Sequence, residues 1–315
     1  MKLRNITFLI LVISLAASAF GQAYMNDIVR DSARSDKLTG GNIKKTALAG
    51  GENDLRITIN VPAFQMTLWQ NGKEVKSYPV GVGLLDYPII IGRREASSIE
   101  WNPVWIPPSS DWIEKSSTVK PGEIILPTDP RNPLGKVKIP LGYGYLIHQA
   151  KGSGDMGSLV SHGCVRVMQS DLYDLAEKIV QARALDVTPK QIAAAKRSKK
   201  TLIAPLEPRV SVEITYDTMV VEAGRLHIYP DVYGYKKNTV GNLKRELKTS
   251  GIDDSKISDS SLAKMIAAVT AKKQFVVDIA SLESGNALKS GKVIPVLSSA
   301  VKPKPAPLKR KRLRR

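Results

Sequence analysis

Cys164, the single cysteine of this chain, is the residue best suited to covalent chemistry. It stands within residues 161–166 (SHGCVR), and two of the three histidines, His148 and His162, lie close to it in sequence. A lone thiol forms no internal disulfide, but its thiolate is a strong nucleophile once a base removes the proton. The sequence therefore predicts a cysteine nucleophile served by an imidazole, with His148 and His162 both open as the base.

The spacing around Cys164 favours acyl transfer. His162 and Cys164 are two positions apart and would share a face on a strand, whereas His148 would arrive from a neighbouring strand. Gly163 lets a substrate approach the backbone closely. Amides near Gly163 and Cys164 are then placed to stabilise an oxyanion, which is worth on the order of 3 kcal/mol per donor. The pattern fits a thioester intermediate and leaves the acyl donor open.

Other residues near the motif leave their roles open. Arg166 either binds a substrate carboxylate or holds the nucleophile loop, and Trp101 and Trp105 either line a groove or pack on the core. His227 stands alone among apolar and aromatic residues, which favours a structural role. We expect no metal and no cofactor, because one cysteine cannot complete a cysteine metal site and the glycines after His148 lack the frame of a phosphate-binding loop.

Hydropathy patterning predicts a β-rich, mixed α+β protein. Apolar and polar residues alternate from Leu55, and Asn71-Gly72 between two such runs is a strong hairpin signal. Residues 84–147 are rich in proline and loops, which is typical of a functional segment. A short strand is expected to end at His148, and residues 209–233 return to strand patterning.

Helices are expected after the motif and near the C-terminus. Ser170 is the expected cap of one helix, and Thr188 begins a second with a capping box. Helical spacing is also found beyond Asn238. We therefore predict a catalytic domain with a β extension over residues 54–235 and a small helical appendage over residues 236–300.

The residue patterns at the two chain ends predict export and contact with the cell envelope. Residues 1–23 have the charge, apolar run and small residues of a signal peptide, with an uncleaved anchor as the alternative, and residues 24–53 form a leader or linker. The net charge is +18, and residues 302–315 hold eight basic and no acidic residues. We expect a disordered tail over residues 301–315 that either meets anionic polymers or lipids or stays solvated. Outside the cytosol, nucleic acid is not an expected partner.

The motif SHGCVR with an upstream His148 resembles the L,D-transpeptidases of the YkuD (ErfK/YbiS) family over about residues 55–233. Supporting segments are residues 78–83 (YPVGVG), 102–108 (NPVWIPP), 132–135 (NPLG) and 230–233 (PDVY). The chain departs from the family where His-Gln replaces the usual His-Gly at 148–149, and where residues 87–92 (YPIIIG) replace a Thr-Pro-Thr-Gly-like turn.

The resemblance implies a YkuD-type β-sandwich and peptidoglycan chemistry in the periplasm, in contact with the cell wall. Cys164 would attack a stem tetrapeptide, His148 would be the base, and the backbone carbonyl of Gln149 would orient its imidazole. The oxyanion region would be formed by His162, Gly163 and Cys164, with Ser161 and Arg166 among the substrate-binding residues. A second stem, or a lysine of an envelope lipoprotein, would resolve the thioester.

Two other functions stay open from sequence alone. If water rather than an amine reaches the thioester, the protein is an endopeptidase or hydrolase that releases crosslinks or tethered proteins. A non-catalytic wall-binding module is the third reading, and the intact cysteine and histidines speak against it.

Overall fold

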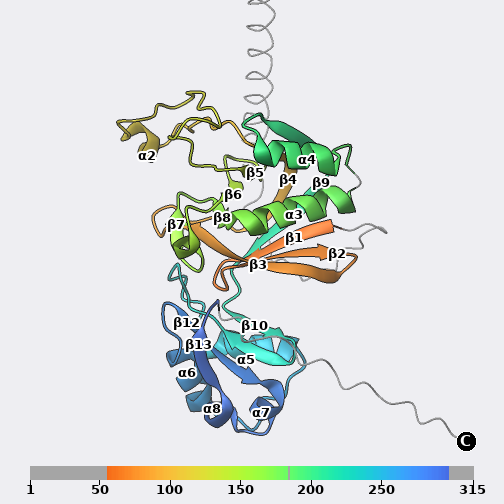
Figure 1. Ribbon diagram of the computed structural model, residues 1–315. Helices are drawn as coiled ribbons and strands as arrows, with labels where there is room; N and C mark the ends of the chain where they lie inside the picture. The colour runs from red at the N-terminus through yellow and green to blue at the C-terminus, as the bar shows by residue number, and fades with distance from the viewer. Residues whose placement is uncertain (1–54, 184, 298–315) are drawn as a thin grey trace, which may run out of the picture.

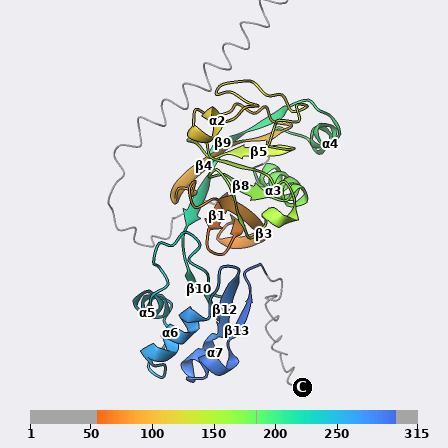
Figure 2. The ribbon, with the colours of Figure 1, turned by 90° about the vertical axis from the view of Figure 1, so that its left-hand side faces the viewer.

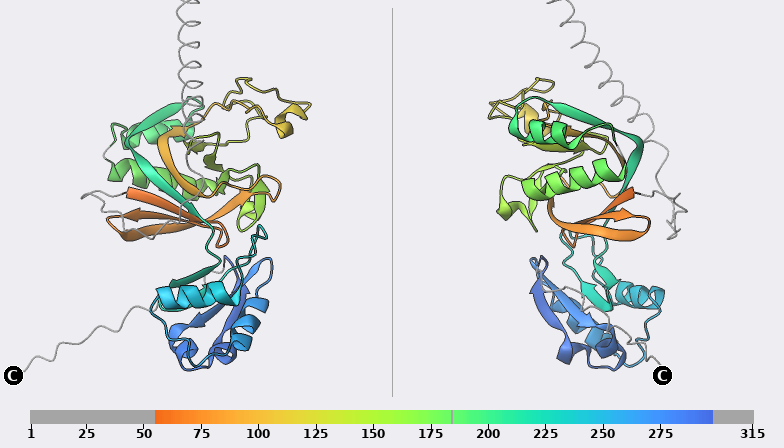
Figure 3. Two further views of the ribbon diagram at one scale, coloured as in Figure 1. Left: turned by 180° about the vertical axis from the view of Figure 1, so that it is seen from behind. Right: turned by 45° about the vertical axis from the view of Figure 1, so that its right-hand side comes forward.

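The computed structural model describes residues 55–183 and 185–297, which form two units of mixed α and β structure (Figure 1). The second unit lies below the first in each of these views (Figure 2 and Figure 3). The expected signal peptide, the leader and the basic tail fall outside the described residues. No helix within the described ranges has both the length and the apolar character needed to cross a bilayer.

Eight strands of the first unit pair in a ring. Their order is β2-β1-β9-β4-β5-β6-β8-β3, and β3 pairs again with β2, while β7 adds to β3 outside the ring. The sheet is therefore a closed barrel, and the expected β-sandwich is not confirmed. The strands are β1 (Leu55–Asn60), β2 (Gln65–Gln70), β3 (Lys73–Gly83), β4 (Gly92–Trp101), β5 (Val137–Pro140), β6 (Leu146–Gln149), β7 (Leu159–Ser161), β8 (Val165–Val167) and β9 (Leu202–Thr215).

Alternation along the strands builds the core of the barrel. In β1, Leu55, Ile57 and Ile59 are buried and the residues between them are partly exposed. The hairpin signal is confirmed, because Asn71 and Gly72 both adopt positive φ (52° and 72°) between β2 and β3. Apolar side chains from the strands of the ring pack in one cluster with those of the helix at residues 169–182.

Two helices complete the first unit. Helix α3 (Gln169–Ala182) buries Leu172, Leu175, Ala176, Ile179 and Val180 in the core of the barrel unit. The prediction that Ser170 caps this helix is wrong, because Ser170 already lies within it. The N-cap residue is Met168, whose side chain makes no capping hydrogen bond. Helix α4 (Pro189–Arg197) has the expected capping box between Thr188 and Gln191. A short helix α2 (Asp111–Glu114) and a 3-10 turn η2 (Ser153–Asp155) lie in the loops.

Residues 236–300 were predicted to form a small helical appendage, but those that the structure describes form a mixed second unit together with the strands before residue 235. Its sheet has the order β10-β11-β12-β13, so strands on the N-terminal side of residue 235 pair with strands beyond it. Strand β12 was missed because a short apolar run does not distinguish strand from helix. The elements are β10 (Met219–Glu222), β11 (Arg225–Ile228), α5 (Val240–Thr249), α6 (Asp259–Ala267), β12 (Lys273–Asp278), α7 (Ile279–Glu283), α8 (Ala287–Ser290) and β13 (Lys292–Pro295).

The connection between the units is tied to the barrel by tyrosines. The hydroxyl of Tyr233 donates to the carbonyl of Gly83 at 2.9 Å, and the amide of Ile89 donates to that hydroxyl at 3.3 Å. Tyr216 donates to Asp231 at 2.5 Å and accepts from the Tyr233 amide at 2.7 Å. The segment 230–233 therefore supports the end of β3, which borders the nucleophile loop described next.

Candidate active site

Cys164 lies in the tight loop between β7 and β8. Ser161 is buried, and its hydroxyl donates to the carbonyl oxygen of Cys164 at 2.5 Å. Its own carbonyl accepts from the amide of Leu84 at 2.8 Å. Ser161 was expected among the substrate-binding residues. Its contacts favour a structural role instead, in which it holds the backbone of the nucleophile in place.

Gly163 is required by the backbone and by its neighbours. Its φ is +104°, a conformation that side chains rarely adopt, and a Cβ there would lie 2.7 Å from Cε1 of Tyr145. A Cβ on Gly83 would lie 3.1 Å from the Cα of Gly163. The ring of Tyr145 and the end of β3 therefore pack directly on the nucleophile loop.

His148 reaches the site from the strand beside β8. Strands β6 and β8 pair in parallel, with Ile147 opposite Val165 and His148 opposite Arg166. Ile147 and Val165 are fully buried in the barrel core, so alternation places His148 on the outer face of β6, and Cys164 directly precedes Val165 at the start of β8. This is the neighbouring-strand placement expected from the sequence, whereas the role of His148 as the base stays a prediction.

A row of charged residues crosses the barrel strands at His148. Glu100, Lys138, His148 and Arg166 are register partners on β4, β5, β6 and β8. Lys138 pairs with Glu100 at 3.0 Å, and Arg166 pairs with Asp155 at 3.0 Å, both largely buried. The charge of Arg166 thus acts on the imidazole, and both cations of the row are paired with an acid.

These surroundings keep His148 neutral. Burial, and then the positive charge of Arg166, lower the pKa of His148 to about 4, while the backbone of Gln149 and Asp155 oppose the change. Nδ1 is buried without a hydrogen-bond partner in the described structure. The backbone of Gln149 still lies close enough to raise the pKa of the imidazole, so the orienting role expected of its carbonyl stays a prediction. Its side chain accepts from the Lys136 amide at 2.8 Å and supports the loop before β5.

The thiol is also neutral at rest. Burial raises the pKa of Cys164 to about 11, although the backbone of Leu146 and the charge of Arg166 act to lower it. With the imidazole pKa far below the thiol pKa, a preformed thiolate–imidazolium pair is not the resting state. Spacing in the sequence does not report how strongly burial disfavours both charges.

His162 does not share a strand face with Cys164, because the turn at Gly163 separates them. It is exposed, and its ring stacks on Trp112 at 4.2 Å between centroids and contacts Tyr87 edge-on at 4.7 Å. Burial, followed by the charges of Arg166 and Lys151, lowers its pKa. His162 therefore packs against the loop that carries α2, a contact that sequence reasoning missed because Trp112 and Tyr87 lie in segments without periodicity.

The segment between β4 and β5 has its own small core. Trp105 and Ile125 pack there with Ile113, Val119 and Leu134, whereas Trp101 is fully buried in the barrel. Both Trp101 and Trp105 are buried, so core packing is the interpretation that their contacts favour. The amide of Asn132 donates to the carbonyl oxygens of Pro103, Ile125 and Leu126 at 3.0 to 3.3 Å.

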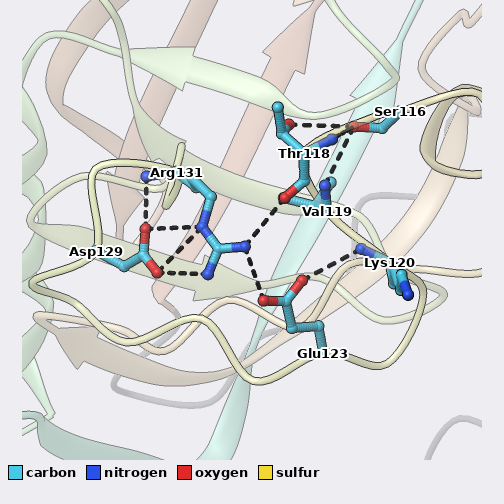
Figure 4. A network of polar contacts seen from close by, with 7 residues as sticks. All are labelled: Ser116, Thr118, Val119, Lys120, Glu123, Asp129 and Arg131. Atoms are coloured by element: carbon cyan, nitrogen blue, oxygen red, sulfur yellow. Dashed lines mark hydrogen bonds and ion pairs between the residues drawn. The ribbon is translucent and has the colours of Figure 1, made fainter.

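An ion-pair network stiffens the outer part of this segment (Figure 4). Arg131 pairs with Asp129 at 2.6 Å and with Glu123 at 2.8 Å, and it donates to the carbonyl of Thr118 at 3.0 Å. Hydrogen bonds from Arg131 lower the pKa of Asp129. These contacts stabilise the conformation of the segment whose Trp112 stacks on His162.

Arg166 and His227 are both held by polar side chains. Arg166 is held by Asp155, which also accepts from the Lys151 amide at 2.8 Å, so holding the loop is the role that its contacts favour. His227 lies in the second unit, where its Nδ1 is 2.9 Å from Oε1 of Gln274. Across residues 55–183 and 185–297, no three His, Cys, Asp or Glu side chains gather in a metal-binding group.

We expect His162 to act through its ring face rather than through its protons. His162→Ala removes the stack on Trp112 and should loosen the 102–136 segment by about 1 kcal/mol, while His162→Phe preserves the stack. Amide hydrogen exchange at Trp112 and Ile113 should speed up about fivefold in the alanine variant only. Equal loss of acylation in both variants would instead assign the ring nitrogens a chemical role.

Comparison with known proteins decides the family. Residues 54–199 match the model of the YkuD L,D-transpeptidase catalytic domain. This domain belongs to the YkuD family. The YkuD domain, as matched, contains Cys164 and His148 together with the 102–136 segment, and it ends before β9.

Curated relatives of the YkuD domain agree. The probable L,D-transpeptidase YbiS of Escherichia coli strain K12 is 31% identical over 130 residues, covering 39% of this chain and 41% of that protein. The probable L,D-transpeptidase ErfK/SrfK of Salmonella typhimurium is 27% identical over 127 residues, covering 39% and 40%. The alignments thus span about two-fifths of the length of these relatives.

A solved structure gives a weaker likeness. The NMR structure of the catalytic domain from an E. faecium L,D-transpeptidase acylated by ertapenem is 15% identical, with a TM-score of 0.35. The match covers 53% of this chain and 100% of that one.

Proposed function

We propose that the protein is a peptidoglycan L,D-transpeptidase in which Cys164 is the nucleophile and His148 the general base. The observation that carries the proposal is the parallel pairing of β6 with β8, which sets the buried His148 beside the strand that begins directly after Cys164, within a YkuD domain. A neutral imidazole is the form that accepts a proton, so the base is ready over a wide pH range.

In the first half-reaction Cys164 attacks the amide between the L-centre of diaminopimelate and the terminal D-Ala of a stem tetrapeptide. The bond from Sγ to the carbonyl carbon forms and the amide C–N bond breaks. His148 takes the thiol proton and delivers it to the departing nitrogen of D-Ala, which leaves a thioester. Proton transfer accompanies the attack because both groups are neutral beforehand.

The oxyanion of this step is assigned to backbone amides of the nucleophile loop. Within the described residues, no loop hydrogen bond to another backbone group uses the N–H of Gly163 or of Cys164. Ser161 holds the Cys164 carbonyl, which fixes the peptide plane between the nucleophile and Val165. Preorganised amides of this kind stabilise charge that develops only in the transition state.

In the second half-reaction an amine attacks the thioester and restores the thiol. The acceptor is a second stem peptide, which gives a 3-3 crosslink, or a lysine of an envelope lipoprotein. We propose export by residues 1–23, a periplasmic location at the cell wall, and contact of the basic tail with anionic envelope polymers or lipids. These segments fall outside the described residues, so this part rests on the sequence alone.

One experiment separates the candidate functions. The purified full chain is incubated with disaccharide tetrapeptide and the products are analysed by mass spectrometry. A dimer that has lost one D-Ala is the expected result. Tripeptide alone would assign hydrolysis instead, and an absence of both turnover and any adduct on Cys164 would leave a wall-binding module and refute the proposal.

A further inference from the structure

Arg94 on β4 is a cation without an acidic partner. The side chain is half-buried, its Nε is buried without a hydrogen-bond partner, and no ion pair joins it to a described residue. The next residue, Glu95, contacts Arg209 at 3.6 Å instead. A partly desolvated guanidinium without a counter-charge is costly, so its retention calls for an explanation.

Two tyrosines hold this guanidinium in place. Arg94 lies 4.9 Å from the ring centroid of Tyr143 and 5.4 Å from that of Tyr145. Both tyrosines come from the turn between β5 and β6, where Gly142, Tyr143 and Gly144 all adopt positive φ (78°, 52° and 77°). Cation–π contacts fix the position of the guanidinium without satisfying its hydrogen-bond donors.

The same tyrosine connects Arg94 to the nucleophile loop. The ring of Tyr145 packs on Gly163, since a Cβ there would meet its Cε1 at 2.7 Å. Burial raises the pKa of Tyr145, the charge of Arg94 lowers it, and negative charge on Cys164 raises it. Arg94 and Cys164 therefore both lie close enough to this ring for their charges to act on its hydroxyl.

We propose that Arg94 binds a carboxylate of the peptide substrate. The inference rests on the proposed function and names the group that the site recognises. A planar guanidinium matches a carboxylate with two parallel hydrogen bonds. A stem tetrapeptide offers the C-terminal carboxylate of D-Ala and the side-chain carboxylate of diaminopimelate, and both flank the scissile amide. Arg166 does not compete for this role, because Asp155 neutralises it.

The test measures binding without turnover. Isothermal titration of the Cys164→Ala protein is carried out with three tetrapeptides: the free acid, the C-terminal amide and the diaminopimelate side-chain amide. We expect one of the two amides to bind about 10- to 100-fold more weakly than the free acid, and that amide identifies the carboxylate. Adding Arg94→Ala should weaken binding of the free acid by the same factor and abolish the difference between the peptides.

Controls separate this inference from the proposed function. Arg93→Ala removes an exposed neighbouring charge and should leave the ratio unchanged, while Arg94→Lys should retain part of it. If Arg94→Ala keeps the full discrimination, or if the free acid does not bind at all, the inference is overturned. Discrimination by the Cys164→Ala protein together with no turnover by the native chain would refute the transpeptidase alone and leave the carboxylate site standing.

Discussion

Replacing Cys164 by alanine should lower turnover of disaccharide tetrapeptide by at least about 10⁴-fold. The substitution removes the atom that forms the thioester, and the described structure offers no second cysteine to replace it. Intact-mass analysis during turnover should show an acyl adduct on the native protein and none on the variant. Alanine fits the half-buried position, so the thermal midpoint should change little.

Cys164→Ser supplies the matched control. Its hydroxyl occupies nearly the same volume but is a much weaker nucleophile than a thiol, so turnover should again be lost while tetrapeptide binding is kept. Turnover by the alanine variant within tenfold of the native rate would show that another residue attacks the substrate. The assignment of Cys164 could not survive that result.

Replacing His148 by alanine should reduce acylation by about 10²- to 10⁴-fold, because a thiol with a pKa of about 11 is almost fully protonated at neutral pH without a base. His227→Ala is the control, since it also deletes a buried imidazole but lies on β11 of the second unit. Rates of thioester formation by stopped-flow or quenched mass spectrometry compare the two. Equal effects would remove His148 from the mechanism.

The pH profile of the native protein tests the same pair. The active form needs neutral His148, and its pKa is lowered to about 4, so kcat/KM should be level at neutral pH and fall only as the pH drops through about 4. An unperturbed histidine would place this limb near about 6.5. A limb at that higher value would contradict a buried base flanked by Arg166.

The chemistry was more predictable from sequence than the geometry. Residue types and spacing were enough to single out Cys164 and to place His148 on a neighbouring strand, because reactive groups and strand alternation are local properties. His162 was misplaced because its position depends on one backbone angle at Gly163. Tyr145 and Arg94 were missed because their contacts join segments far apart in the chain.

Closure of the sheet was likewise invisible in the sequence. Alternating residues report that one face of a strand is buried, but a sandwich and a barrel share that pattern. Residues beyond 235 were taken as helical because apolar residues repeat there at helical spacing, while Lys273–Asp278 carries no alternation. Only the pairing of β11 with β12 reveals the mixed unit.

The position of β9 limits how far the protein can be truncated from its C-terminal end. It pairs in parallel with β1 and antiparallel with β4, so it closes the ring, yet it begins at Leu202, after the family match ends at residue 199. A fragment trimmed at 199 would bare the edges of β1 and β4, and unpaired strand edges are templates for aggregation. For recombinant work, an insoluble 54–199 fragment would therefore say nothing about catalysis, and the shortest useful truncation must retain Thr215.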